Sequence, residues 1–190
     1  MVIVEFIGFP LMILLHTYGG GGILSGFLHP LLGLDHLLAM LAVGVLSAQI
    51  GGRAIWTVPT TFVITMGVGA LLGIAGLSLP LVEYGITLSV LILGVAILVG
   101  DNVPERVALI AVAFFALFHG NAHGTEIPAI TDTIGLLIAY ILGFLIATAG
   151  LHVVGALIGI MMGRSLRGPM LMRLGGLAIA LVGIALILNV

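Results

Sequence analysis

The sequence predicts an all-α integral membrane protein, and its composition and its apolar segments both support that class. The chain has 190 residues, of which 62% are hydrophobic and only 6% are charged, whereas soluble domains carry about 25% charged residues. Its mean hydropathy is +1.42. Apolar stretches of roughly 20 residues, the length of a membrane-spanning helix, recur between glycine, proline and charged residues. No room is left for a separate soluble domain.

About six transmembrane helices are expected in one bundle. Their approximate ranges are 27–48, 55–76, 81–100, 107–123, 133–162 and 170–190. The fifth range is long enough to tilt or to extend past the bilayer, and residues 124–132, which include Pro128, are expected to form a loop. We therefore divide the chain into an N-terminal hydrophobic segment with a glycine-rich outer stretch, 1–26, and a six-helix transmembrane domain, 27–190.

The arginines predict the orientation of the bundle. The chain has five Lys or Arg residues, all arginine, and they fall between spans one and two, three and four, and five and six: Arg53, Arg106, Arg164, Arg167 and Arg173. Because all five lie on one side, the positive-inside rule makes that side cytoplasmic. The protein is thus expected to be a multi-pass protein of the plasma (inner) membrane, with both ends of the six-span core outside.

The opposite side carries acidic residues and no Lys or Arg, which would concentrate cations there. These residues are Glu83, Glu126 and Asp132. The alternative is that an outer surface simply lacks basic residues.

The start of the chain permits three interpretations. Residues 2–15 are apolar apart from Glu5, too short for a comfortable span, and followed by His16 and a run of glycines. They resemble the apolar part of a signal peptide but have no basic region and no small-residue cleavage site. Cleavage, a re-entrant segment and a span all remain open.

Several function classes are disfavoured by composition. The absence of cysteine excludes disulfides, thiolate metal sites and iron–sulfur clusters. The chain has no Walker A motif, so no ATP-driven step is expected in it, and no basic patch suggests nucleic acid. Glycines four residues apart, at Gly69 and Gly73 and at Gly155, Gly159 and Gly163, predict close helix packing. The expected partners are the lipid bilayer and, as one option, a second copy of the chain.

The first polar cluster lies in span one and contains His29, Asp35 and His36. Ionisable groups inside a membrane are costly and indicate a functional site. In a continuous helix His29 and His36 would share one face, two turns or about 10 Å apart. Pro30 fits the first turn of such a helix, and Met40 would lie on the same face as His36.

The second cluster lies at the outer end of span four. His119 and His123 are an i, i+4 pair, and Glu126 joins their stripe if the helix continues that far. Gly120 and Gly124 would let another helix or an ion approach. If spans one and four pack together, they place four imidazoles and two carboxylates in the outer half of the membrane, a set that suits Ni²⁺, Co²⁺, Zn²⁺ or Cu²⁺.

Other polar residues are weaker metal-ligand candidates. His152 is isolated in span five and is expected to be a helix–helix hydrogen bonder, with metal binding as the alternative. His16 could capture metal from the outer segment. Glu83 is expected to be a solvated rim charge rather than a ligand, and Met40 is more often a packing residue.

Both clusters resemble signatures of the HupE/UreJ family of nickel and cobalt permeases. The first signature, His, five residues and Asp-His, stands here at His29, Asp35 and His36. The second, Phe-His-Gly-x-Ala-His-Gly-x-Glu, is complete from Phe118 to Glu126. The resemblance implies that residues 27–190 form a metal-permease domain, that both signatures recognise metal, and that the protein supplies nickel to hydrogenase or urease maturation. Members often have a histidine at a processed N-terminus, which His16 would match.

We therefore expect a permease, not an enzyme, that moves Ni²⁺ or Co²⁺ as its substrate and needs no prosthetic group. The expected metal ligands are drawn from the set His29, Asp35, His36, His119, His123 and Glu126. Two alternatives remain: a membrane-embedded zinc-dependent hydrolase, in which histidines and a carboxylate hold a zinc-bound water, and a bis-imidazole haem protein. The chain has no His-Glu-x-x-His motif for the first.

Overall fold

The computed structural model describes residues 22–127 and 133–190, and these residues contain seven α-helices, one short 3₁₀ helix and no strand. The helices are α2 (Ile23–Leu32), α3 (Leu34–Ile50), α4 (Ala54–Ile74), α5 (Val82–Val99), the 3₁₀ helix η1 (Gly100–Asn102), α6 (Glu105–Glu126), α7 (Ile134–Gly163) and α8 (Gly168–Ile187). Five of them, α4 to α8, are long and apolar enough to cross a membrane, and the bent pair α2–α3 makes a sixth crossing if it is one span. The predicted all-α membrane bundle is confirmed.

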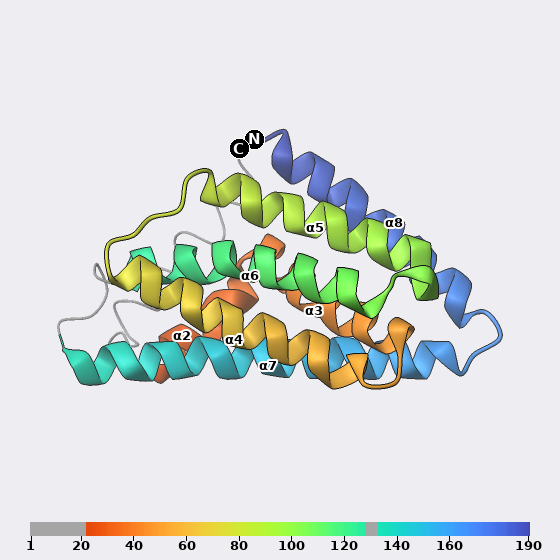
Figure 1. Ribbon diagram of the computed structural model, residues 1–190, viewed down its shortest axis with the longest axis horizontal. Helices are drawn as coiled ribbons and strands as arrows, with labels where there is room; N and C mark the ends of the chain where they lie inside the picture. The colour runs from red at the N-terminus through yellow and green to blue at the C-terminus, as the bar shows by residue number, and fades with distance from the viewer. Residues whose placement is uncertain (1–21, 128–132) are drawn as a thin grey trace.

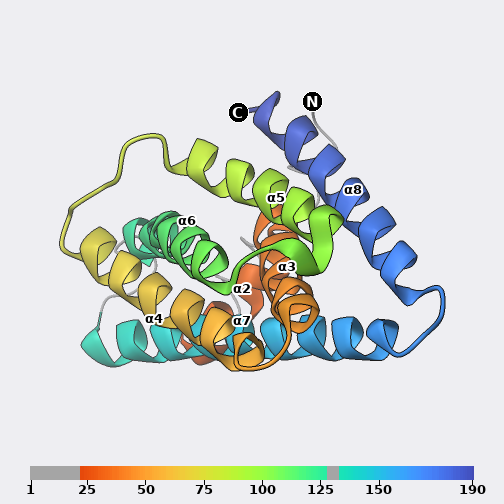
Figure 2. The same cartoon turned by 45° about the vertical axis from the view of Figure 1, so that its right-hand side comes forward.

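Helix α3 lies at the centre of the bundle, with longer helices around it (Figures 1 and 2). Helix α4 packs along α6, α5 packs along α8, and α7 runs the length of the bundle beside α2 and α3. Buried apolar side chains from α3 to α7 fill the space between them. Large apolar side chains are exposed on the outward faces of α4 to α8, as expected of helices that contact lipid.

Glycine allows α4 and α6 to approach closely. A Cβ at Gly120 would fall on the carbonyl group of Met66, and one at Gly124 would fall on the carbonyl group of Ala70. In return, a Cβ at Gly69 of α4 would meet the backbone of α6. Small residues at this spacing let helix backbones touch in lipid, so the expected close approach at Gly120 and Gly124 is confirmed.

Glycines also allow α3 and α7 to approach closely. A Cβ at Gly155 would meet the carbonyl oxygen of Leu41, and one at Gly159 would lie 2.6 Å from the Cβ of Ala48. The packing role predicted for these two glycines is therefore confirmed. It is wrong for Gly163, where a Cβ would meet no described atom within 4 Å, because α7 ends there.

The connections α3–α4, α5–α6 and α7–α8 meet at one end of the bundle (Figure 1). All five arginines lie in these connections or in the first two turns of the helix that follows. At this end, which we call the arginine end, Arg53 Nε donates to both oxygens of Glu105 at 3.1 and 2.9 Å. The hydroxyl of Thr57 donates to Glu105 Oε1 at 2.8 Å. Glu105 also raises the pKa of Arg53. These contacts hold the start of α4 to the start of α6.

The first predicted span differs most from the structure. Residues 27–48 do not form one helix, because α2 and α3 meet at an angle of 85°. Gly33, between them, has an extended backbone (φ −82°, ψ 118°), and Pro30 lies in the last turn of α2 rather than in the first turn of a helix. Proline removes a helical hydrogen bond and glycine stabilises helix poorly, so a break here is physically reasonable.

The end of the fourth predicted span also differs. Helix α6 continues through Gly124 to Glu126, so these residues are helical and do not belong to the expected loop. The rest of that loop, 128–132, and the N-terminal segment 1–21 lie outside the described residues.

Candidate metal centre

The six main metal-ligand candidates come together from three helices. Helix α2 supplies His29, α3 supplies Asp35 and His36, and α6 supplies His119, His123 and Glu126. The ring centroids of His36 and His119 are 4.6 Å apart, those of His36 and His123 are 4.9 Å apart, and those of His29 and His123 are 4.6 Å apart. We call these six residues the histidine cluster.

His123 occupies the middle of the cluster, and this corrects the geometry expected for span one. His29 and His36 do not share a helical face, because the chain breaks between them at Gly33. Both instead pack edge to face against the His123 ring. The two histidines of the first signature thus both contact a histidine of the second signature.

Asp35 orients His36. The carboxylate oxygen Oδ1 of Asp35 accepts from the backbone N–H of His36 at 2.7 Å and lies 3.0 Å from its ring nitrogen Nδ1. A carboxylate partner assigns the proton to Nδ1 and leaves a lone pair on Nε2, as in carboxylate–histidine–metal sites. His36 Nε2 is buried without a hydrogen-bond partner among the described residues.

Ser89 of α5 orients His119. The Ser89 hydroxyl donates to the carbonyl oxygen of Ile86 at 2.6 Å, and its oxygen lies 2.9 Å from His119 Nε2. Since its single proton is already used, the hydroxyl accepts from Nε2–H. The lone pair of His119 is therefore on Nδ1, which is buried and has no partner within the described part of the chain.

His123 is held by stacking rather than by hydrogen bonds. Its ring lies parallel to that of Phe144 on α7, with centroids 4.8 Å apart and planes 8° apart. The side chain is fully buried, and neither ring nitrogen has a partner in residues 22–127 and 133–190. Adjacent rings on α3 and α6 thus offer unpaired nitrogens at His36, His119 and His123.

His29 differs from the other three histidines because both of its ring nitrogens are engaged. Nδ1 lies 2.9 Å from the hydroxyl of Tyr140, and Nε2 lies 3.1 Å from Glu126 Oε2. The pair depends on the continuation of α6 to Glu126, which confirms the stripe of His119, His123 and Glu126. An ion bound by His29 or Glu126 would have to separate them.

Acidic groups mark the exposed edge of the cluster. The side chains of Asp35 and Glu126 are 22% and 46% exposed. Glu83, in the first turn of α5, is exposed and close enough for its charge to interact with Asp35, His36 and Glu126. The start of α5 and the end of α6, which carry Glu83 and Glu126 of this carboxylate edge, lie at the end of the bundle opposite the arginine end (Figure 1).

Of the other residues singled out in the sequence, His16 and Asp132 lie outside the described residues. Met40 is fully buried in α3. His152 is buried in α7, and neither of its ring nitrogens has a partner among the described residues, so its expected role as a helix–helix hydrogen bonder is wrong.

In the described residues, no set of three or more His, Cys, Asp or Glu side chains is arranged to hold one metal ion. The cluster places its rings in contact without directing them at one point. Binding of an ion would therefore require side-chain rotation, which is free of competing bonds at His123 but would disturb the contacts of His36 with Asp35 and of His119 with Ser89.

Sequence reasoning missed the residues that fix the cluster. Besides Ser89 and Tyr140, Asn121 holds the α4–α5 connection: its Oδ1 accepts from the N–H of Leu79 and its Nδ2 donates to the carbonyl of Leu77, both at 2.8 Å. The available signal was that each is a polar residue inside an apolar span. That signal does not identify the partner.

Comparison with known proteins agrees with the two signatures. A family model described as HupE / UreJ protein matches residues 4–186. The chain belongs to the HupE/UreJ family. Protein HupE from Rhizobium leguminosarum bv. viciae is 45% identical over 169 residues, which are 88% of this chain and 85% of that protein. No solved structure matches the chain.

HupE/UreJ is a transporter-type family associated with nickel and cobalt uptake for hydrogenase and urease. The resemblance drawn from the sequence is thus confirmed. Membership gives no support to the zinc-dependent hydrolase alternative.

Proposed function

We propose that this HupE/UreJ protein takes up Ni²⁺ or Co²⁺ across the plasma membrane through the histidine cluster, without ATP hydrolysis by this chain. One observation carries the proposal: His36, His119 and His123 lie in mutual contact and each has a buried, unpaired ring nitrogen. Imidazole is a ligand that suits nickel and cobalt. A buried polar atom without a partner is costly, and a passing cation would satisfy it.

The carboxylate edge is the proposed entrance. Asp35, Glu83 and Glu126 would concentrate cations and replace part of their hydration shell. In this proposal the edge faces outward and the arginine end is cytoplasmic, following the positive-inside rule. Both ends of the six-span core then lie outside.

Weak, changeable coordination supports transport rather than storage. An ion must bind well enough to enter and loosely enough to leave, and rings that do not converge on one point suit that requirement. The membrane potential supplies about 4.6 kcal/mol per 100 mV to a divalent cation moving inward, twice the single-charge value. Uptake could thus proceed without ATP. The metal would then serve hydrogenase or urease maturation, as its family association suggests.

Uptake of radioactive nickel into cells that express the chain tests the proposal. We expect His36→Ala and His123→Ala to reduce uptake to the level of cells without the protein, because each removes an unpaired ring nitrogen from the cluster. Excess Co²⁺ should compete and excess Mg²⁺ should not. Zn²⁺ competition would define how selective the cluster is.

The matched control is Leu71→Ala, a truncation of an exposed side chain on α4. It should retain wild-type uptake, and all variants should be present in the membrane at equal amounts by immunoblot. Wild-type uptake by both histidine variants would exclude the cluster as the transport site.

A further inference from the structure

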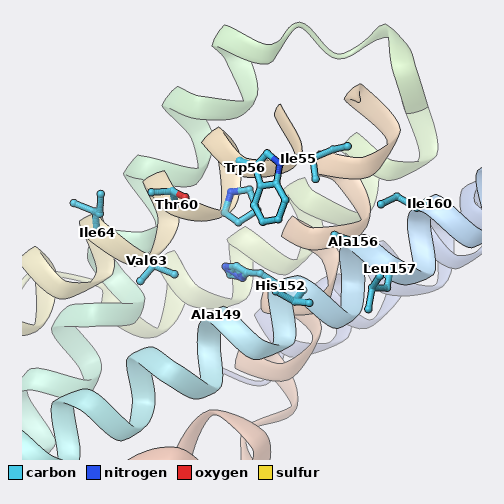
Figure 3. Close-up of a pocket in the computed structure, with 12 residues that line it drawn as sticks. Ile55, Trp56, Thr60, Val63, Ile64, Ala149, His152, Ala156, Leu157 and Ile160 are labelled. Carbon is cyan, nitrogen blue, oxygen red and sulfur yellow. The ribbon is translucent and has the colours of Figure 1, made fainter. Parts of the chain in front are cut away.

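A second polar feature lies between the histidine cluster and the arginine end. A cavity of about 400 Å³ opens between the first half of α4 and the second half of α7. Its walls are almost entirely apolar, and the polar side-chain atoms among its lining residues belong to Trp56, Thr60 and His152. Figure 3 shows the His152 imidazole extending from α7 toward α4, with Trp56 and Thr60 on the opposite wall.

His152 is not explained by packing alone. Its side chain is 1% exposed, and neither ring nitrogen has a hydrogen-bond partner in the described part of the chain. A buried imidazole without partners is unfavourable unless something that enters the cavity supplies them. A leucine or phenylalanine would fill the same space without that penalty.

Phe62 links this imidazole to the histidine cluster. The ring of Phe62 is fully buried, with its centroid 5.6 Å from that of His119 and 5.1 Å from that of His152. One aromatic side chain therefore separates the innermost histidine of the cluster from the cavity. That ring would have to move for an ion to pass from His119 to His152.

The cavity offers a cation few ligands besides His152. Thr60 contributes a hydroxyl, and most of the other lining residues are aliphatic. No carboxylate is among them. A cation that leaves His152 would thus meet few ligands, which favours release over retention.

We propose that His152 and the α4–α7 cavity form an exit site, at which a divalent transition-metal ion from the histidine cluster binds transiently before it leaves at the arginine end. The proposal rests on the proposed function, since it assigns the inward path of the same ion. The order of sites is the cluster, then His152 beyond Phe62, then the cavity.

The first test separates binding from transport. His152→Phe and His152→Leu should retain Ni²⁺ binding at the histidine cluster of the purified protein, because the cluster is intact, but should lower the nickel uptake rate about tenfold or more. His123→Ala is the reference that should lose both. Wild-type uptake by both His152 variants would overturn the exit site and leave the proposed function intact. Absence of nickel uptake by the wild-type protein would instead overturn the proposed function.

A second test does not depend on how the His152 variants fold. The chain has no cysteine, so single cysteines can be introduced at Thr60, on the cavity wall, and at Val68, an exposed α4 residue away from the cavity. In inside-out vesicles, a membrane-impermeant thiol reagent should label Thr60→Cys, and Ni²⁺ should slow that labelling. Val68→Cys should remain unlabelled because its thiol faces lipid.

If neither cysteine is labelled, the cavity is filled by lipid chains and the exit site is wrong. Labelling of Thr60→Cys that Ni²⁺ does not change would show a water-filled cavity that the ion does not use, which also contradicts the proposal.

Discussion

Helix α6 and the α2–α3 pair share the histidine cluster, but they position its side chains by different means. Helix α6 is unbroken from Glu105 to Glu126, and its position is set by backbone contact with α4 at Gly120 and Gly124. The α2–α3 pair bends by 85°, and its ligands are positioned by side-chain hydrogen bonds to Asp35, Tyr140 and Glu126. Close backbone packing is common to both, since α3 also meets α7 at Gly155 and Gly159. The difference is that an unbroken helix spaces the cluster residues of α6, whereas side-chain contacts position those on either side of the bend.

The largest effect should come from removing the polar contact at the bend. Asp35→Ala deletes the acceptor for both the backbone N–H and the ring Nδ1–H of His36. Loss of such an orienting partner typically lowers metal affinity about 10- to 100-fold, and we expect this range for Ni²⁺ binding measured by equilibrium dialysis. Asp35→Asn keeps an oxygen acceptor and should lose less. Equal affinity in wild type and Asp35→Ala would mean that the bend does not rely on this contact.

The corresponding change on α6 should act through packing. Gly120→Ala would add a Cβ that collides with the carbonyl group of Met66. Overpacking of this kind lowers the stability of the folded protein by about 1–3 kcal/mol. We expect a lower melting temperature in detergent. Gly67→Ala is the matched control on α4, since its Cβ would meet no described atom within 4 Å. A fall of equal size in both variants would show that helix approach at Gly120 is not the cause.

The smallest effect should come from Ser89. Ser89→Ala removes the acceptor that fixes the His119 proton on Nε2, so part of the population would carry the proton on Nδ1 and have its lone pair on Nε2 instead. A net hydrogen bond is worth about 0.5–1.5 kcal/mol, which limits the expected loss of nickel affinity to about tenfold. Ser47→Ala loses only a bond to the carbonyl of Gly44 and should bind nickel as wild type does. Equal losses of nickel affinity in Ser89→Ala and Ser47→Ala would show that the Ser89 contact does not act by fixing the proton of His119.

The same contrast explains what could be predicted from sequence. On α6 the spacing of His119, His123 and Glu126 predicted one stripe, because the helix is regular and its period applies throughout. In span one the spacing of His29 and His36 implied a common face, and that was wrong, because Pro30 and Gly33 permit either a kinked helix or a break and only packing against α7 decides. The partners Ser89 and Tyr140 lie 30 and 111 residues from the histidines that they contact. Local periodicity carries no information about such distant pairs.

The break at Gly33 also has a consequence for hydration. The last carbonyl groups of α2 and the first N–H groups of α3 lack partners within their own helices, and among those N–H groups His36 bonds to Asp35 at 2.7 Å. Hydrocarbon cannot satisfy the others, so water or protein polar groups must reach this level of the chain. An ion that arrives here still partly hydrated need not lose all of its hydration shell in one step. Discrimination between Ni²⁺ and Mg²⁺ would then depend on how readily each ion exchanges single water molecules for imidazole nitrogen.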